Sequence, residues 1–261
     1  MNSLIKYTLQ LADSALILGH RNSEWTGHGP ILEQDIAISN IALDLIGQAR
    51  NFYQYAAQLL NSSSPQLLNS STEDTLAFHR DVIDYKNVLL AEQPNGDWAK
   101  TILRQFFFSG YQYYLYQQLQ HSTDPQLAAI AEKSLKEVTY HLKWSSEWVI
   151  RLGDGTDESH LRMKNALKEL WQFTGELRTA SQYESDLFAE KISPDYNLIK
   201  SNWDQKINEV LTEANLSPYL NTELKDTWMQ SGGKEGKHTE QLGFLLAEMQ
   251  FLQRAYPGAE W

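Results

Sequence analysis

Hydrophobic side chains recur every three or four residues along two long stretches of this chain. The first stretch covers residues 36–56 and the second covers residues 127–149. This spacing places apolar side chains on one side of an α-helix, where they face a core. Both stretches are therefore predicted to be core helices. Their inward faces consist of Ile38, Ile41, Leu45, Gln48, Phe52 and Tyr55 in the first, and Leu127, Ile130, Leu135, Val138, His141 and Trp148 in the second.

The same period predicts helices along most of the chain. With the two core helices included, they are expected at about 4–18, 30–59, 72–90, 98–119, 125–153, 158–178, 196–214 and 238–255. A weaker helical patch is expected at 218–230, and the Ser- and Asn-rich stretch 61–72 is expected to be an exposed loop. No run of residues alternates as a β-strand would. We therefore predict an all-α protein with a single domain, 1–261, whose bundle core covers about 4–153 and whose additional helices cover about 158–256.

The predicted helix at 98–119 carries aromatic side chains on more than one side. A helix that is apolar on several sides is buried in a core or in a contact between subunits. We expect a central core helix, and an intersubunit surface is the alternative. If the chain forms a homodimer, this helix and the C-terminal helix are the expected contacts.

Each core helix also carries one polar residue on its apolar face, Gln48 in the first and His141 in the second. Each of the two follows an aliphatic residue by three positions and an acid by four; the four preceding residues are Leu45, Asp44, Val138 and Glu137. Carboxylate-bridged di-metal bundles use Glu-x-x-His on each of two helices in this way. Because Leu45 and Val138 stand at the glutamate positions, the sequence predicts the frame of such a bundle without its ligands.

A simpler role accounts for the remaining polar groups at these positions. His141 is expected to be a buried imidazole with a hydrogen-bonded neighbour, and Gln48 an amide that needs a similar partner. Asp44 and Glu137 are expected on the flanks of the two apolar faces. Two other acids precede a histidine by three residues, in the pairs Glu235–His238 and Asp157–His160, but both pairs stand where a loop meets a helix. We expect these two spacings to be coincidental.

A glycine-rich loop, residues 232–237, precedes the last helix and suggests phosphate binding. Its spacing is one residue shorter than that of a P-loop, His238 stands where Ser or Thr is required, and no strand precedes it. A nucleotide site is therefore not predicted. A helix N-terminus beside Lys234, Lys237 and His238 is still a candidate contact for a carboxylate or phosphate of a ligand or partner.

Composition excludes several classes of function. The 261 residues include 22 Lys and Arg against 33 Asp and Glu, a net charge of −11, which argues against nucleic acid or an anionic membrane as partner. The absence of cysteine excludes disulfides, thiolate metal sites and cysteine nucleophiles, and it suits a reducing cytoplasm. Neither a signal peptide nor a membrane-spanning segment is expected.

Several long, irregular segments point to one family. They are NIALDLIGQARN at 40–51, EQPNG at 92–96, LGDGTD at 152–157, GGKEGKHTE at 232–240, LLAEMQ at 245–250 and PGAEW at 257–261. In these segments, and over nearly its whole length, the chain resembles the C subunits of bacterial phenylacetyl-CoA ring epoxidases. These enzymes are the multicomponent oxygenases of aerobic phenylacetate breakdown.

The resemblance implies a ferritin-like bundle of the di-iron carboxylate type that has lost its metal ligands. It implies pairing with a related catalytic A subunit, which holds the di-iron centre and binds the CoA thioester. A reductase with flavin and an iron–sulfur cluster supplies electrons from NADPH. Where the A subunit has Glu-x-x-His, this chain has Leu45-Ile-Gly-Gln48 and Val138-Thr-Tyr-His141.

The function predicted from the sequence is therefore that of a non-catalytic subunit with no metal or cofactor of its own. Its expected partners are the A subunit, the other subunits of the complex and the reductase. One alternative is a di-metal oxygenase with unusual ligands drawn from Asp44, Glu137 and His141. Another is an acyl-CoA-binding helper that uses Lys234 and Lys237.

Overall fold

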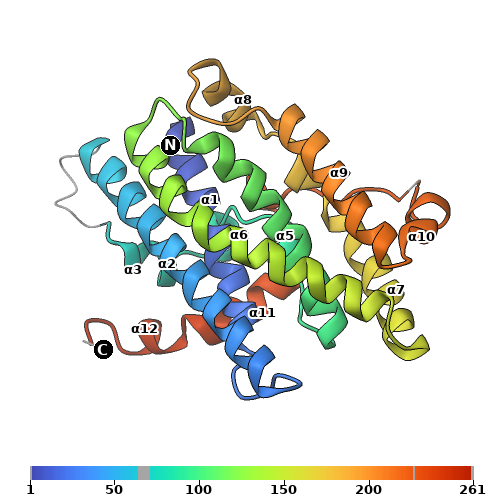
Figure 1. The fold of residues 1–261 in the computed structure, drawn as a ribbon. Coiled ribbons are helices and arrows are strands. Elements are labelled where there is room, and N and C mark those ends of the chain that lie inside the picture. The colour runs from blue at the N-terminus through green and yellow to red at the C-terminus, as the bar shows by residue number, and fades with distance from the viewer. Residues whose placement is uncertain (1, 64–70, 226, 260–261) are drawn as a thin grey trace. The chain divides into compact units, whose positions relative to one another are not determined.

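A computed structural model describes residues 2–63, 71–225 and 227–259 of the chain (Figure 1). All regular secondary structure in these ranges is helical, which confirms the all-α prediction. Part of the predicted loop at 61–72, namely residues 64–70, and one residue of the patch at 218–230 lie outside the described residues. None of the described helices is both long enough and apolar enough to cross a membrane.

The chain divides into two compact units. The first consists of residues 1–94 together with 232–261, and the second of residues 95–231. The C-terminal segment therefore belongs with the N-terminal helices, although more than a hundred residues separate them in sequence. The prediction of a single domain stays a prediction.

Two long helices that pack along each other form the first unit's main part, α1 (Ser3–Ser23) and α2 (Leu32–Ser63). The Asn2 side chain caps α1 by accepting a hydrogen bond from the N–H of Ile5 at 2.8 Å. Gly19 permits a close approach between the two helices. A Cβ atom there would lie 3.3 Å from the carbonyl oxygen of Ala42 and from Cβ of Leu45.

The predicted helix at 72–90 is wrong. The structure has three short pieces there, α3 (Glu73–Phe78), η1 (Val82–Asp84) and α4 (Leu89–Glu92). The cause is tertiary. The backbone N–H of Lys86 donates to the Asp13 carboxylate at 2.8 Å, and that of Val88 to Ser14 Oγ at 3.2 Å. Because side chains of α1 bind these N–H groups, a continuous helix cannot use them.

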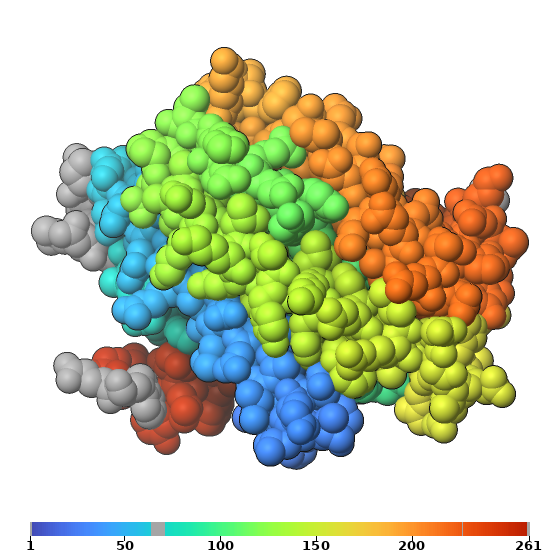
Figure 2. Space-filling view, in the orientation of Figure 1, coloured from blue at the N-terminus to red at the C-terminus, as the bar shows by residue number. Residues whose placement is uncertain are grey.

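The predicted C-terminal helix at 238–255 is shorter and interrupted. The structure has η4 (Gly233–Glu235), α11 (Glu240–Met249) and α12 (Phe251–Ala255), with a break at Gln250. The start moves to Glu240 because the N–H and hydroxyl of Thr239 both donate to the Glu92 carboxylate. Figure 2 shows part of the C-terminal segment, in red, at the surface of the first unit.

The second unit is built on another pair of long helices, α5 (Trp98–Leu119) and α6 (Pro125–Gly153). Their predicted bounds are confirmed, and an aspartate caps the start of each helix. Asp97 accepts from the N–H of Lys100 at 3.0 Å, and Asp124 accepts from the N–H of Leu127 at 2.9 Å. Most side chains of α5 are buried, as expected for a central helix.

Shorter helices complete this unit: α7 (Asp157–Leu170), η2 (Trp171–Phe173), η3 (Gly175–Arg178), α8 (Gln182–Ala189), α9 (Tyr196–Glu213) and α10 (Ser217–Thr222). The predicted helix at 158–178 thus ends in 3₁₀ turns, and α8 lies in a stretch for which no helix was predicted. Phe107, Trp171 and Trp203 pack together, with ring centroids 5.7–6.1 Å apart, and Trp203 Nε1 donates to the Phe107 carbonyl at 2.9 Å. The fold is all-α and ferritin-like, with one pair of long helices in each unit, α1–α2 in the first and α5–α6 in the second.

Candidate functional site

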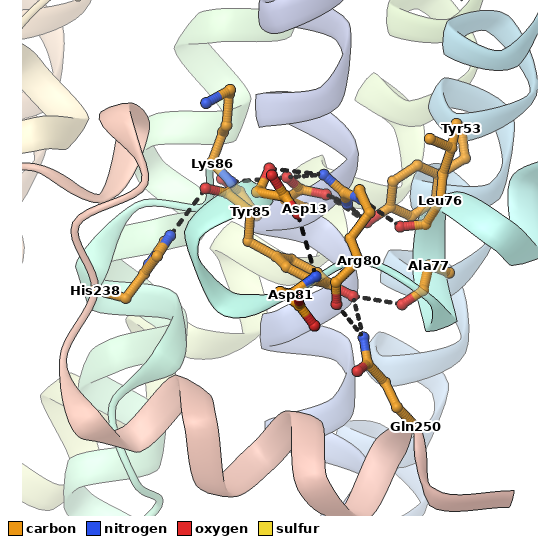
Figure 3. Close-up of polar contacts among 12 residues, drawn as sticks. Asp13, Tyr53, Leu76, Ala77, Arg80, Asp81, Tyr85, Lys86, His238 and Gln250 are labelled. Carbon is orange, nitrogen blue, oxygen red and sulfur yellow. Dashed lines mark hydrogen bonds and ion pairs between the residues drawn. The ribbon is translucent and has the colours of Figure 1, made fainter. Parts of the chain in front are cut away.

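A cluster of buried polar side chains in the first unit surrounds Asp13 of α1 (Figure 3). The Asp13 side chain is completely buried. Its carboxylate accepts from the hydroxyl of Tyr53 at 2.5 Å, from the N–H of Lys86 at 2.8 Å and from both terminal nitrogens of Arg80. Its negative charge is thus balanced by one guanidinium and shared among several donors, as burial requires.

Arg80 holds the segment after α3 in place. Its Nε donates to the Leu76 carbonyl at 2.5 Å, its Nη1 donates to the Asp84 carbonyl at 3.0 Å, and its guanidinium lies 4.3 Å from the ring centre of Tyr85. Burial alone would lower the pKa of Arg80, but the charge of Asp13 raises it overall. Arg80 therefore stays a cation. Burial raises the pKa of Tyr53, and the negative charge of Asp13 raises it further, so the Tyr53 hydroxyl stays a neutral donor.

The C-terminal segment joins this cluster through Gln250. Its side-chain nitrogen donates to the Arg80 carbonyl and to the Tyr85 hydroxyl, each at 3.0 Å. The Tyr85 hydroxyl in turn donates to the Ala77 carbonyl, and burial raises the pKa of Tyr85. These bonds explain why a buried glutamine stands at the break between α11 and α12.

A second buried ion pair, His238–Glu92, lies in the same unit. Both side chains are fully buried, and His238 Nδ1 lies 2.8 Å from Glu92 Oε2. His238 Nε2 lies 2.9 Å from the Tyr85 carbonyl. A carbonyl and a carboxylate both accept hydrogen bonds, so the ring requires a proton on each nitrogen. His238 is therefore a cation in the folded protein.

The Glu92 carboxylate accepts further hydrogen bonds from Asn87 at 2.8 Å and from the N–H and hydroxyl of Thr239 at 2.7 and 2.8 Å. Arg21 donates to the Glu92 carbonyl at 3.0 and 3.2 Å. The arrangement therefore neutralises and anchors internal charges. It leaves no carboxylate or imidazole of this group open to a substrate.

The charge of His238 makes this anchor dependent on pH. Burial alone would lower the pKa of His238, but the hydrogen bond and charge of Glu92 and the Tyr85 carbonyl raise it overall. A pKa that folding raises contributes stability in full below the histidine pKa of the unfolded chain, about 6.5. That contribution is lost as the pH rises through the pKa of the folded state.

The positions predicted to be lost metal ligands lie inside the protein. Leu45 and Val138 are fully buried, and Gln48 and His141 are buried as well. Leucine and valine offer no donor atom, and in the described ranges no three His, Asp or Glu side chains lie where they could hold a metal ion. These residues do not fit a di-iron site. The assignment of the four positions to former ligands stays a prediction, as does a role for the half-buried acids Asp44 and Glu137.

The glycine-rich loop has a structural reason for its glycines. Gly236 has a φ of +84°, and a Cβ atom there would collide with the Ile83 carbonyl oxygen. Of the three predicted contacts for an anion or partner, Lys234 and the His238 ring are buried and Lys237 is exposed. Contact with an anion stays a prediction, and Lys237 is the one of these three side chains that reaches solvent.

In the structure, the histidines of the two acid–histidine pairs seen in the sequence contact other groups. His238 is paired with Glu92 rather than with Glu235. His160 lies 2.6 Å from the Gly153 carbonyl and 3.2 Å from the Tyr219 hydroxyl, whereas Asp157 is the first residue of α7. That both spacings are coincidental stays a prediction.

The residues that form the buried cluster were not predicted from the sequence. Asp13 could have been noticed as an acid among apolar residues of the first helix. Arg80, Tyr85 and Glu92 carried no signal, because their partners lie up to 174 residues away in the chain. Their role follows from the tertiary structure alone.

Comparisons with known proteins agree with these features. A family model described as "Phenylacetic acid catabolic protein" matches residues 1–261. The chain is also 46% identical to the C subunit of the 1,2-phenylacetyl-CoA epoxidase of Escherichia coli (strain K12). That match extends over 261 residues and covers 100% of both chains.

Proposed function

The chain belongs to the phenylacetic acid catabolic protein family, and on that premise we propose that it is the C-type subunit of a phenylacetyl-CoA epoxidase. In this role it supplies no catalytic residue, and it pairs with and stabilises the di-iron catalytic A subunit. The observation that carries the proposal is the 46% identity to the C subunit of such an epoxidase over the full length of both chains. A match that covers both chains completely favours the same place in the same kind of complex.

The interior of the chain supports a structural role. Leu45 and Val138 occupy positions at which a metal-binding relative would need carboxylates. The buried acids Asp13 and Glu92 are fully engaged in ion pairs and hydrogen bonds that fasten the chain to itself. A scaffold of this kind suits the proposal because a metal site in a partner depends on rigid surroundings.

The cofactors of the reaction then belong to other chains of the complex. Di-iron is assigned to the A subunit, and flavin, an iron–sulfur cluster and NADPH to the reductase. The proposed place of action is the cytoplasm. The acyl-CoA-binding alternative is less favoured, because one of its two lysines, Lys234, is buried.

Reconstitution tests this function. The catalytic subunit and the reductase are assayed for phenylacetyl-CoA epoxidation with and without this chain, and the thermal stability of the catalytic subunit is measured in both mixtures. We expect the chain to raise turnover and stability together, and to show no turnover with the reductase alone. Turnover by this chain without the catalytic subunit, or a catalytic subunit that is equally active and stable without it, would contradict the proposal.

A further inference from the structure

A cavity of about 190 Å³ lies in the first unit, lined by residues of α1, α2 and α3. The short helix α3 packs beside α2 there (Figure 1). Apolar side chains make up most of the lining: Leu16, Ile46, Ala49, Ala77 and Phe78. Water finds few hydrogen-bond partners in so apolar a space. An apolar molecule of matching size is therefore the better occupant.

The lining extends from the core of the unit to its surface. Leu16, Ala49 and Ala77 are buried, whereas Ile46 and Phe78 are partly exposed. A molecule can therefore enter from solvent and reach buried apolar side chains. Folded proteins rarely leave a space of this size unfilled. Here the two alanines leave room that a larger residue at either position would occupy.

The size of the cavity restricts its occupant to one ring. Pockets for drug-sized ligands have volumes of about 300–1,000 Å³, whereas a cavity of about 150 Å³ lined by leucine, isoleucine and phenylalanine binds benzene. Two aromatic side chains, Tyr53 and Phe78, belong to the lining. Aromatic rings pack favourably against one another edge-to-face or offset, so a single aromatic ring fits better than an aliphatic molecule.

The rim of the cavity, formed by Arg50, Glu73 and Asp74, determines the charge of the occupant. Arg50 Nε lies 3.6 Å from Glu73 Oε1, so these two charges balance each other. Asp74 is exposed and adds one negative charge. A carboxylate or phosphate would be repelled by Asp74 and would lose hydration against the apolar lining. The occupant is therefore uncharged.

Asp74 also supplies a hydrogen-bond acceptor. Among the described residues, no hydrogen bond or ion pair engages its carboxylate. A ligand hydroxyl or N–H group at the rim can therefore donate to it, and such a bond to a charged acceptor is stronger than one between neutral groups.

We propose that this cavity binds a small, uncharged aromatic molecule with one hydroxyl or N–H donor, of which phenol is the simplest example. The ring occupies the apolar space, and the donor faces the Asp74 carboxylate at the rim. Because α3 contributes Asp74, Ala77 and Phe78, the occupant fastens this short helix to α2. Tyr53, which donates to Asp13 in the buried cluster, lies against the same cavity. The subunit role proposed above holds whether or not the cavity is filled.

Calorimetric titration of the full chain with phenol tests the site. We expect saturable binding and a melting temperature that rises with phenol concentration. Ala77→Leu should weaken phenol binding about tenfold or more and raise the melting temperature without ligand, because it fills the space. Ala49→Leu does the same from α2, in case Ala77→Leu does not fold. Ala37→Leu is the matched control, since this alanine of α2 is buried but does not line the cavity, and phenol affinity should be unchanged.

A ligand series tests the chemistry of the site. Toluene has the shape of phenol without its donor, and benzoate carries a charge. Benzoate should bind more weakly than phenol. The ratio of phenol affinity to toluene affinity should fall in Asp74→Ala, which removes the acceptor.

Several results would overturn the inference. They are the absence of saturable phenol binding, equal phenol affinities of the cavity-filling variants and Ala37→Leu, benzoate bound as tightly as phenol, or an unchanged affinity ratio in Asp74→Ala. Loss of phenol binding when the catalytic subunit is bound would also overturn it, because the cavity would then hold a side chain of that subunit.

Discussion

Replacing Arg80 with methionine is the sharpest perturbation of the buried cluster. It removes a guanidinium that donates to both carboxylate oxygens of Asp13, a side chain with no exposed surface. The carboxylate keeps the Tyr53 hydroxyl and the Lys86 N–H but loses its counter-charge. Removing one partner of a buried ion pair lowers the free energy of unfolding by about 3–5 kcal/mol. We expect the lower part of that range, because two donors remain.

Two further variants separate charge burial from lost packing. Adding Asp13→Asn to Arg80→Met removes the uncompensated charge, so the double variant should be more stable than the single one. Arg254→Met is the matched control in the same unit. Arg254 pairs with Asp81 at 2.9 Å, but the two side chains are 44% and 76% exposed. An exposed pair of this kind contributes at most about 1 kcal/mol.

Urea denaturation followed by circular dichroism measures all three variants against the wild type. The expected order of stability is wild type, Arg254→Met, the double variant and then Arg80→Met. The reasoning is refuted if Arg80→Met loses no more than the exposed control. It is equally refuted if the double variant is as unstable as Arg80→Met alone.

Three further predictions concern the C-terminal segment and the core positions. The difference in unfolding free energy between wild type and His238→Gln should shrink as the pH rises above about 6.5, which is the histidine pKa in the unfolded chain. A difference that does not depend on pH would contradict the assignment of His238 and Glu92 as an ion pair. Gly236→Ala should lower stability by about 1–3 kcal/mol through strain and collision and increase hydrogen exchange in residues 232–259. Gly27→Ala is the control for Gly236→Ala, because Gly27 has a φ of +83° but no atom within 4 Å of an added Cβ. If the two variants lose the same stability, the collision at Gly236 does not contribute. Gln48→Ala and His141→Ala should each lower the melting temperature of the complex while turnover per folded complex is kept; unchanged melting with lost epoxidation would argue for a direct role.

The long helices were predictable because local chemistry determines them. The stretches 98–119 and 125–153 have a clear helical period, and Asp97 and Asp124 mark their starts. The stretch 72–90 also has a helical period, yet it is broken where Asp13 and Ser14 bind backbone N–H groups. Contacts between residues 73 and 74 positions apart cannot be read from a local pattern.

The candidate site was predictable only in part. The burial of Gln48 and His141 was predicted from the helical period and is confirmed, whereas the assignment of Leu45 and Val138 to former ligand positions came from a recognisable spacing and stays a prediction. The anchoring of the C-terminal segment was not, because His238 was predicted as a possible contact for an anion of a ligand or partner, and the acid it pairs with in the structure, Glu92, lies 146 residues earlier. The glycines of 232–237 suggested phosphate binding, but at Gly236 the reason is the close approach of the Ile83 backbone.

The central claim is that this chain is an accessory subunit without a metal of its own. Its most direct test is the iron content per chain, measured by mass spectrometry of metals after the chain is purified alone and after it is co-purified with the catalytic subunit. The account predicts no stoichiometric iron in the isolated chain, and two iron atoms per catalytic subunit in the complex, as expected for a di-iron carboxylate site. Stoichiometric iron bound to the isolated chain, or failure of the two chains to co-purify, would contradict it.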